Sequence, residues 1–310
     1  MSKKYIISVF AALISAGLAQ GQTLMYEYSF NDAANATYTT STGSTSATAD
    51  FTNYVTEGST DRTSYNLFGS STSGVSGQAG DYAFDNSIST EMGGSGAING
   101  TGAGYGGLGL ASGTATGFNG LTSFTISGWY KANSLPSNYA RLIEIGSSST
   151  STSVLFQGNS GSSATNLRLG TNVGGATANL EVNNAMLLAV DSWVFFAFAV
   201  DGVNGTITLY AGTDSAAVTQ LGSADITAGT VYVGGDSLAI GNSMGSGNQR
   251  PFDGLMDNVR VWGSSTDASG ALSLSTLESV RSGDVIPEPS TYAGLFGAAV
   301  VCLVLLRRRR

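Results

Sequence analysis

The side chains with which this sequence could do chemistry are mainly carboxylates and aromatic rings. It contains no histidine, which removes the commonest general base and the commonest metal ligand. Catalytic triads that use histidine and the HExxH zinc motif are therefore excluded. The single cysteine, Cys302, lies near the C-terminus, so the chain before it has no disulfide, no thiolate nucleophile and no cysteine-ligated zinc.

Asp257 is the strongest candidate for a metal ligand. It lies in Leu255–Trp262, where alternation predicts a strand, and a period-two pattern places it on the face of Val259, with Arg260 on the opposite face. A carboxylate that faces a core must be paired, hydrogen-bonded or bound to a metal, because burial of a bare charge is very costly. Two alternatives remain open: a calcium site, which suits a chain without histidine, or a carboxylate that accepts backbone N–H bonds.

Glycan cleavage is the enzymatic alternative, and hydrolysis requires two carboxylates roughly 5–9 Å apart. Glu144 and Glu181 are isolated acids, and Gly146 and Ser148 stand where further acids would be needed beside Glu144. A lyase usually draws on histidine, tyrosine, lysine or arginine, and between the two ends of the chain the basic residues are only Lys131 and six arginines. The sequence therefore predicts no catalytic residue and no enzyme.

Sugar binding would require exposed aromatic rings beside polar groups, and three residues are candidates. Strand alternation puts Trp129 and Trp262 on the faces opposite their apolar neighbours, and Tyr105 lies in a glycine-rich loop where it could close over a ligand. The competing interpretation for each ring is packing against the other sheet, a loop or the C-terminal helix.

Short apolar or alternating runs separated by glycine and small polar residues predict an all-β protein. The apolar run Trp193–Val200 predicts a central strand buried on both faces, joined in a hairpin to Thr206–Tyr210. Residues 34–120 are expected to form long loops with one or two strands, and Ser264–Arg281 a short helix. Further strands are predicted at Met25–Phe30, Phe124–Lys131, Asn166–Leu169, Val231–Val233, Ser237–Ile240 and Gly254–Trp262.

The charge of the chain is strongly acidic between its two ends. Six of the 13 basic residues lie at the ends, which leaves seven basic residues against 21 acidic ones, a net charge of −14 for the body. A body this acidic has no electrostatic footprint for nucleic acid or for an anionic membrane surface.

Residues 1–21 have the pattern of a secretory signal peptide. Lys3 and Lys4 precede the apolar run Tyr5–Leu18, and small residues follow at Ala19 and Gly21, where cleavage would occur. The alternative is an uncleaved anchor helix, for which the run is short, because a span takes about 20 residues.

Residues 284–310 resemble the PEP-CTERM sorting signal of Gram-negative bacteria. The triplet Pro287, Glu288 and Pro289 precedes an apolar stretch, Tyr292–Leu306, and a tail of Arg307, Arg308, Arg309 and Arg310. The resemblance implies transient anchoring in the inner membrane by helix 292–306 and processing by an exosortase, a membrane-embedded cysteine transpeptidase. It also implies delivery to the outer surface or the exopolysaccharide matrix. The alternative is an ordinary tail anchor.

The body between these ends resembles the laminin-G-like, concanavalin A-like jelly roll. The segments that carry the resemblance are YEYSFND at 26–32, FTISGWYK at 124–131, DSWVFFAFAVDG at 191–202, GTITLY at 205–210 and FDGLMDNVRVW at 252–262. The resemblance implies one domain over residues 22–283, built as a two-sheet antiparallel β-sandwich. It also implies a structural calcium, with backbone oxygens near Asn31 and Asp32 joining Asp257. Members of this fold range from lectins and glucanases to scaffolds, so fold does not settle function.

The sequence thus predicts an exported cell-surface or matrix protein with a binding or structural domain. Its expected partners are extracellular polysaccharide or a matrix protein, together with the exosortase that would process it. The alternative function is a glycan-active enzyme, a glycoside hydrolase or lyase, on the same jelly roll.

Overall fold

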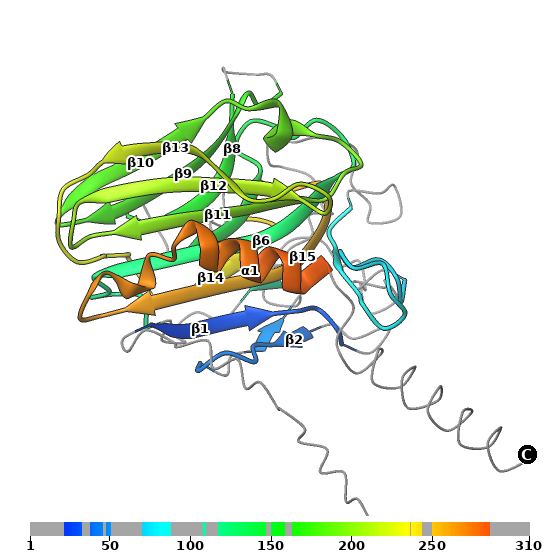
Figure 1. Ribbon diagram of the computed structural model, residues 1–310, viewed down its shortest axis with the longest axis horizontal. Coiled ribbons are helices and arrows are strands. Elements are labelled where there is room, and N and C mark those ends of the chain that lie inside the picture. The colour runs from blue at the N-terminus through cyan, green and yellow to red at the C-terminus, as the bar shows by residue number, and fades with distance from the viewer. Residues whose placement is uncertain are drawn as a thin grey trace, which may run out of the picture.

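The structure, a computed structural model, describes residues 22–32, 38–45, 48–50, 70–87, 108–109, 117–146, 150–158, 163–235, 237–243 and 250–285. Within these residues two antiparallel sheets pack against each other (Figure 1). This confirms the predicted two-sheet antiparallel β-sandwich.

The seven-stranded sheet has the order β1-β15-β6-β11-β12-β13, and β4 pairs with β15 beside that path. Its strands are β1 (Thr23–Tyr28), β4 (Phe84–Asp85), β6 (Ser123–Ala132), β11 (Val194–Asp201), β12 (Thr206–Thr213), β13 (Thr219–Asp225) and β15 (Gly254–Ser264).

The eight-stranded sheet has the order β10-β9-β8-β7-β14-β5-β3-β2. Its strands are β2 (Tyr38–Thr40), β3 (Thr48–Asp50), β5 (Leu108–Gly109), β7 (Arg141–Ile145), β8 (Thr152–Gln157), β9 (Asn166–Val173), β10 (Ala176–Val182) and β14 (Leu238–Ile240). The helices within the described residues are α1 (Leu274–Val285) and two short 3-10 helices, η3 (Ala185–Leu188) and η4 (Ala268–Gly270).

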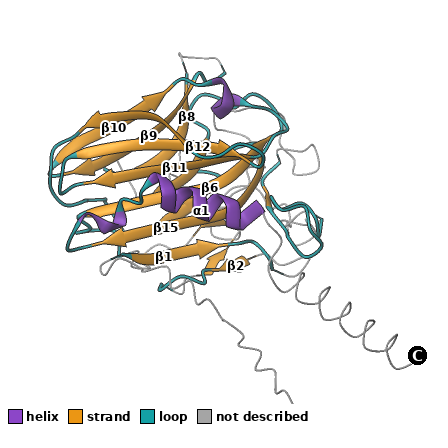
Figure 2. Ribbon diagram, in the orientation of Figure 1, coloured by secondary structure: helices purple, strands orange, loops and turns teal. Residues whose placement is uncertain are grey.

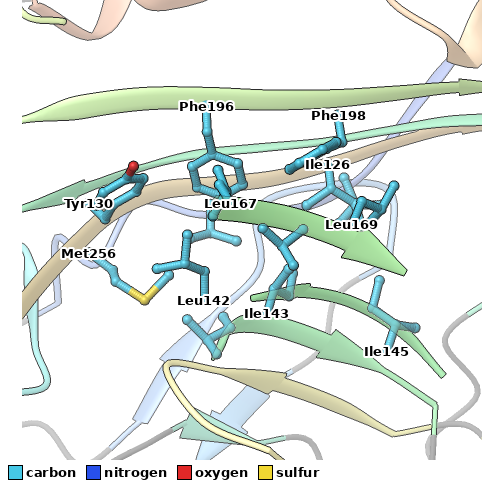
Figure 3. Close-up of a cluster of buried hydrophobic side chains, with 14 of the residues drawn as sticks. Ile126, Tyr130, Leu142, Ile143, Ile145, Leu167, Leu169, Phe196, Phe198 and Met256 are labelled. Atoms are coloured by element: carbon cyan, nitrogen blue, oxygen red, sulfur yellow. The ribbon is translucent and has the colours of Figure 1, made fainter. Parts of the chain in front are cut away.

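The main core lies between the two sheets (Figure 3). Phe196 and Phe198 of β11 and Ile126 of β6 meet Leu167 and Leu169 of β9 there. Each strand contributes alternate residues, because successive side chains of a strand point to opposite faces. Burial of these apolar side chains stabilises the sandwich.

A second core lies on the outer face of the seven-stranded sheet, where α1 crosses it (Figure 2). Phe195 and Ala197 of β11 point into this core and pack with Leu277 of α1. Strand β11 is therefore buried on both faces, as its apolar sequence predicts. The predicted helix also forms, but it begins at Leu274, whose side chain is exposed, and it continues to Val285.

Two element predictions differ from the structure. Val231–Val233 is not a strand, because only Val231 makes an isolated bridge, to Val173. The described parts of residues 34–120 contain β2, β3, β4 and β5, more strands than predicted. Each of these has only two or three residues, too few for an alternating pattern to be visible in the sequence.

Candidate functional site

Trp129 and Trp262 are buried, so the prediction that they form exposed binding platforms is wrong. Trp129 is 0% exposed and Trp262 is 6% exposed. Both lie in the core beneath α1, with Leu277, and Trp129 packs edge-on against Phe195 at 5.3 Å between ring centroids. Both tryptophans pack against the C-terminal helix, as the competing interpretation of the sequence expects.

An ion cluster attaches the end of α1 to the same face of the sheet. Arg260 donates to both carboxylate oxygens of Asp284 at 2.8 Å, and its Nε donates to Glu27 Oε1 at 2.8 Å. The indole Nε1 of Trp129 donates to Asp284 Oδ2 at 2.9 Å. Burial opposes the charge on Arg260, but Asp284 and Glu27 outweigh burial and raise the pKa of the guanidinium above its ordinary value. The guanidinium therefore keeps its charge, and its bonds to Asp284 hold the last turn of α1 in place.

Asp257 lies on the outer face of the seven-stranded sheet. Its sequence pattern predicts a position between the two sheets, on the face of Val259, and this prediction is wrong. A β-bulge between Asp257 and Arg260, with Asn258 at a φ of 47°, adds one residue to β15 and shifts its alternation. Asp257 pairs directly with Trp129, which faces α1, whereas Val259 faces the main core. Arg260 consequently shares the outer face with Asp257, contrary to the predicted opposite faces.

Residues 70–87 cover Asp257, whose side chain is 0% exposed. Its Oδ2 accepts the backbone N–H of Val75 at 2.8 Å, so the predicted backbone hydrogen bond is present. Its Oδ1 is buried without a hydrogen-bond partner among the described residues. Burial, and then the negative charge of Asp81, raise the pKa of Asp257 well above its ordinary value. A cation at Oδ1 would stabilise this carboxylate.

A calcium ion at Asp257 stays a prediction, and the structure shows part of what such a site requires. Asp81 is a second carboxylate, near enough for its charge to act on Asp257. Asn31 Oδ1 accepts the N–H of Tyr82 at 2.8 Å, so the opening segment of the chain, with Asp32, meets the loop of Asp81. No cluster of three or more histidine, cysteine or acidic side chains occurs within the described ranges. Calcium bound here would take its remaining ligands from backbone carbonyls and water, which it accepts readily.

The outer face of the eight-stranded sheet is polar and rich in amides. Alternation turns Leu167 and Leu169 of β9 into the core and Arg168 outward. Residues paired with the outward positions of β9 project to the same side. Leu155 and Ser153 of β8 also project to this side but are buried, and we call the polar residues that are at least partly exposed the amide face: Gln157, Asn166, Arg168, Asn172, Thr177, Asn179 and Glu181.

Neighbouring acceptors hold Arg168 at the centre of the amide face. Its Nη2 donates to Asn179 Oδ1 at 2.6 Å and its Nη1 to Gln157 Oε1 at 3.1 Å. Its Nε lies 3.5 Å from Glu181 Oε1, in an ion pair whose side chains are 27% and 41% exposed. The one positive and the one negative charge of the amide face therefore lie together.

Two exposed tyrosines lie at opposite ends of the amide face. Tyr232 is 58% exposed, and its N–H donates to the carbonyl of Asn172 at 3.1 Å, near the end of β9. Tyr139 is 36% exposed, and its N–H donates to the carbonyl of Phe156 at 2.7 Å, beside Gln157. Along β9, five residues separate Leu167, which pairs with Phe156, from Asn172, a distance of about 17 Å at the rise of a strand.

Tyr139 is held rigidly in a strained conformation. Its φ is 72°, which is unusual for a bulky residue and is a kind of strain that gathers at functional sites. The guanidinium of Arg250 lies 4.3 Å from the centre of its ring. The backbone of Arg250 is itself fixed, since its N–H donates to Asn242 Oδ1 at 2.7 Å and its carbonyl accepts the N–H of Arg141.

Neither tyrosine is among the residues that the sequence predicts for ligand binding. The sequence contains a signal for the exposure of Tyr232. It lies between Val231 and Val233, and two buried valines imply that the ring between them points outward. No local pattern marks Tyr139, whose exposure depends on the turn that precedes β7.

Glu144 and Glu181 do not form a pair for glycoside hydrolysis. They lie on β7 and β10, three strands apart, which separates them by about 14 Å at the spacing of paired strands. The separation in known glycosidases is at most roughly 9.5 Å. Glu144 is 5% exposed and forms an ion pair with Arg141 at 3.3 Å, while Glu181 pairs with Arg168.

Several predicted features lie outside the described residues: Tyr105, the signal peptide 1–21, the Pro287–Pro289 triplet, the apolar run 292–306 and the terminal arginines. Within the part of the chain that is described, no helix has the length and apolar character needed to cross a membrane.

Comparison with known families gives one match, over residues 103–269, to the profile of the concanavalin A-like lectin/glucanases superfamily. The matched region is more than half of the chain and includes β5 to β15. No curated protein matches the sequence.

Solved structures with a similar fold include domain 4 of AbnA, a GH43 extracellular arabinanase from Geobacillus stearothermophilus, in complex with arabinotriose. It is 16% identical, and the alignment covers 84% of this chain and 100% of that one, with a TM-score of 0.46. The CBM40 of the Ruminococcus gnavus IT-sialidase, bound to α2,3-sialyllactose, is 19% identical over 52% of this chain and 83% of that one, with a TM-score of 0.40. A heptameric SAP-like pentraxin from Limulus polyphemus is 17% identical over 54% and 72%, with a TM-score of 0.38.

Proposed function

This chain belongs to the concanavalin A-like lectin/glucanase superfamily, and we propose that within it the chain acts as a carbohydrate-binding protein without catalysis. The observation that carries the proposal is the amide face between two exposed tyrosines, Tyr139 and Tyr232. The carboxylates that the sequence offered for hydrolysis are too far apart and are each paired with an arginine.

The chemistry of the amide face suits hydroxyl groups. Side-chain amides and threonine donate and accept hydrogen bonds, as a sugar hydroxyl does. An aromatic ring at the surface contributes a large, rigid contact area at little cost in conformational entropy. A separation of about 17 Å along β9 between the backbone contacts of the two tyrosines favours an oligosaccharide or polysaccharide over a single sugar.

Removal of the two tyrosine rings should weaken polysaccharide binding. We expect the double variant Tyr139→Asn and Tyr232→Ser to lose at least about tenfold in affinity, roughly 1.4 kcal/mol. Asparagine tolerates the left-handed conformation of residue 139, so this variant should remain folded. The measurement is retention of the full chain, in mild detergent, on a panel of immobilised polysaccharides.

The matched control is Val203→Ser. Val203 is 51% exposed, but it lies in the turn between β11 and β12 of the other sheet. This control should bind as the parent does. Parent-like binding by the tyrosine variant, with its melting temperature unchanged, would place the site elsewhere.

We further propose that the protein is exported and that its C-terminal segment directs sorting to the cell surface or extracellular matrix. The order of Pro287–Pro289, the apolar run 292–306 and four arginines supports this, together with the N-terminal signal pattern. An exosortase would be the processing partner. The membrane would be a transient partner through the apolar run.

The sorting proposal has a direct test in the mass of the mature protein. Intact-mass analysis of protein from the producing cell should show an N-terminus beyond residue 19 and a C-terminus lacking Arg310. Glu288→Gln should prevent the C-terminal loss while leaving the N-terminal loss in place. A mature protein that retains Arg310 would contradict C-terminal processing.

A further inference from the structure

We infer that the amide face selects a neutral glycan and discriminates against glycans that carry carboxylate or sulfate groups. This inference rests on the proposed carbohydrate binding and names the chemical class of the ligand. The observations that carry it are the two hydrogen bonds of Arg168 within the protein and its ion pair with Glu181, which balances its charge.

Two donors of Arg168 are already directed to acceptors of the protein, and its Nε is buried, with no hydrogen bond among the described residues but within ion-pair distance of Glu181. Asn179, Gln157 and Glu181 surround it at 2.6, 3.1 and 3.5 Å. An arginine recognises a carboxylate best with two parallel N–H donors, so a carboxylate ligand would compete with Gln157 and Asn179 for the two Nη groups. Displacing Glu181 would in addition bring two carboxylates together on one guanidinium.

Arg141 and Arg250 lie beyond β8 from Arg168, and both side chains make contacts within the protein. Arg141 forms an ion pair with the buried Glu144 at 3.3 Å and is half-buried itself. Arg250 stacks on Tyr139, and its backbone is bonded on both sides. These contacts fix the edge of the amide face, and that edge supports the ring of Tyr139.

The charge of the whole body also opposes an acidic ligand. Seven basic residues stand against 21 acidic ones between the two ends of the chain. A polyuronate would meet this negative field over the Debye length of about 8 Å at physiological salt. A neutral polysaccharide would meet only the paired amides and hydroxyls, whose hydrogen bonds are insensitive to salt.

The experiment compares neutral and acidic polysaccharides on one protein preparation. The full chain, in mild detergent, is passed over a β-glucan, a galactomannan, a xylan, alginate and polygalacturonate, at about 0.05 and 0.5 M salt. We expect retention on at least one neutral polysaccharide, changing by less than about twofold with salt. Retention on the two polyuronates should be at least about tenfold weaker.

A charge variant makes the test specific to Arg168. Glu181→Gln removes the paired carboxylate and should confer retention on polyuronates that falls as salt rises. Glu278→Gln is the matched control, because Glu278 is also paired with an arginine, Arg281 at 2.7 Å, but on α1 across the other sheet. The control should gain no such retention.

The outcomes separate this inference from the proposed function. Stronger retention of the parent on polyuronates than on neutral glycans would overturn the inference and leave carbohydrate binding intact. Absence of uronate retention by Glu181→Gln would overturn the role of Arg168. Absence of retention on every polysaccharide would overturn the proposed function, and the inference with it.

Discussion

Replacing Arg260 by alanine should lower the free energy of unfolding by about 3 to 5 kcal/mol, because it removes one partner of a buried ion cluster. Arg260 is 13% exposed and bonds to Glu27 and to Asp284, which is 7% exposed. Without the guanidinium these two carboxylates would remain close together and uncompensated. Urea unfolding of the variant and the parent, monitored by tryptophan fluorescence, measures the difference.

Two variants separate the lost charge from lost packing. Arg260→Met keeps most of the length of the side chain, so a loss close to that of alanine would assign the effect to charge. Adding Asp284→Asn to Arg260→Met removes one stranded carboxylate and should recover part of the loss. Asparagine can still accept the indole N–H of Trp129. If Arg260→Met remains within about 1 kcal/mol of the parent, the cluster contributes no more than a surface pair.

Saturating calcium should raise the melting temperature of the full chain, and Asp257→Asn should abolish this response. At about a hundredfold excess over its dissociation constant, a bound ion adds about 2.7 kcal/mol. That corresponds to a rise of about 5 to 10 °C for a domain of this size. The reason is the buried Oδ1 of Asp257, which has no hydrogen-bond partner among the described residues, in a carboxyl whose pKa is raised by burial and then by the charge of Asp81. Differential scanning fluorimetry with calcium and with chelator measures the shift.

Three controls define the calcium site. Magnesium should give a much smaller shift, because it demands a tight octahedral shell. Asp81→Asn should weaken the calcium response, whereas Asp225→Asn, on the edge strand β13, should leave it unchanged. A parent protein whose melting temperature is the same with calcium and with chelator would favour the alternative, in which Asp257 only accepts N–H bonds.

Much of the fold could be predicted from local sequence, because its causes are local. The apolar run of β11 has no polar face to expose, and it is buried on both sides. The hairpin that follows is closed by Asp201, whose carboxylate accepts the N–H groups of Val203 and Asn204. Such features depend on residues next to one another in the chain.

The candidate site was harder to predict, because it depends on which face of a strand is covered. The bulge after Asp257 reverses the face that simple alternation assigns to it. Helix α1 covers Trp129 and Trp262, whose alternation alone is consistent with exposure. Tyr139 is exposed in a turn where its backbone is left-handed, and no sequence motif predicts this turn.

By itself, the sequence determined the class of the fold, the acidic charge and the absence of histidine chemistry. It also marked Asp257 as a carboxylate that needs a partner. The tertiary structure decided which polar and aromatic residues meet at a surface: it buried the tryptophans, left two tyrosines exposed and brought the amides of three strands together. The physical reason is that alternation divides a strand into two faces, but only the packing of distant elements determines which face is removed from water.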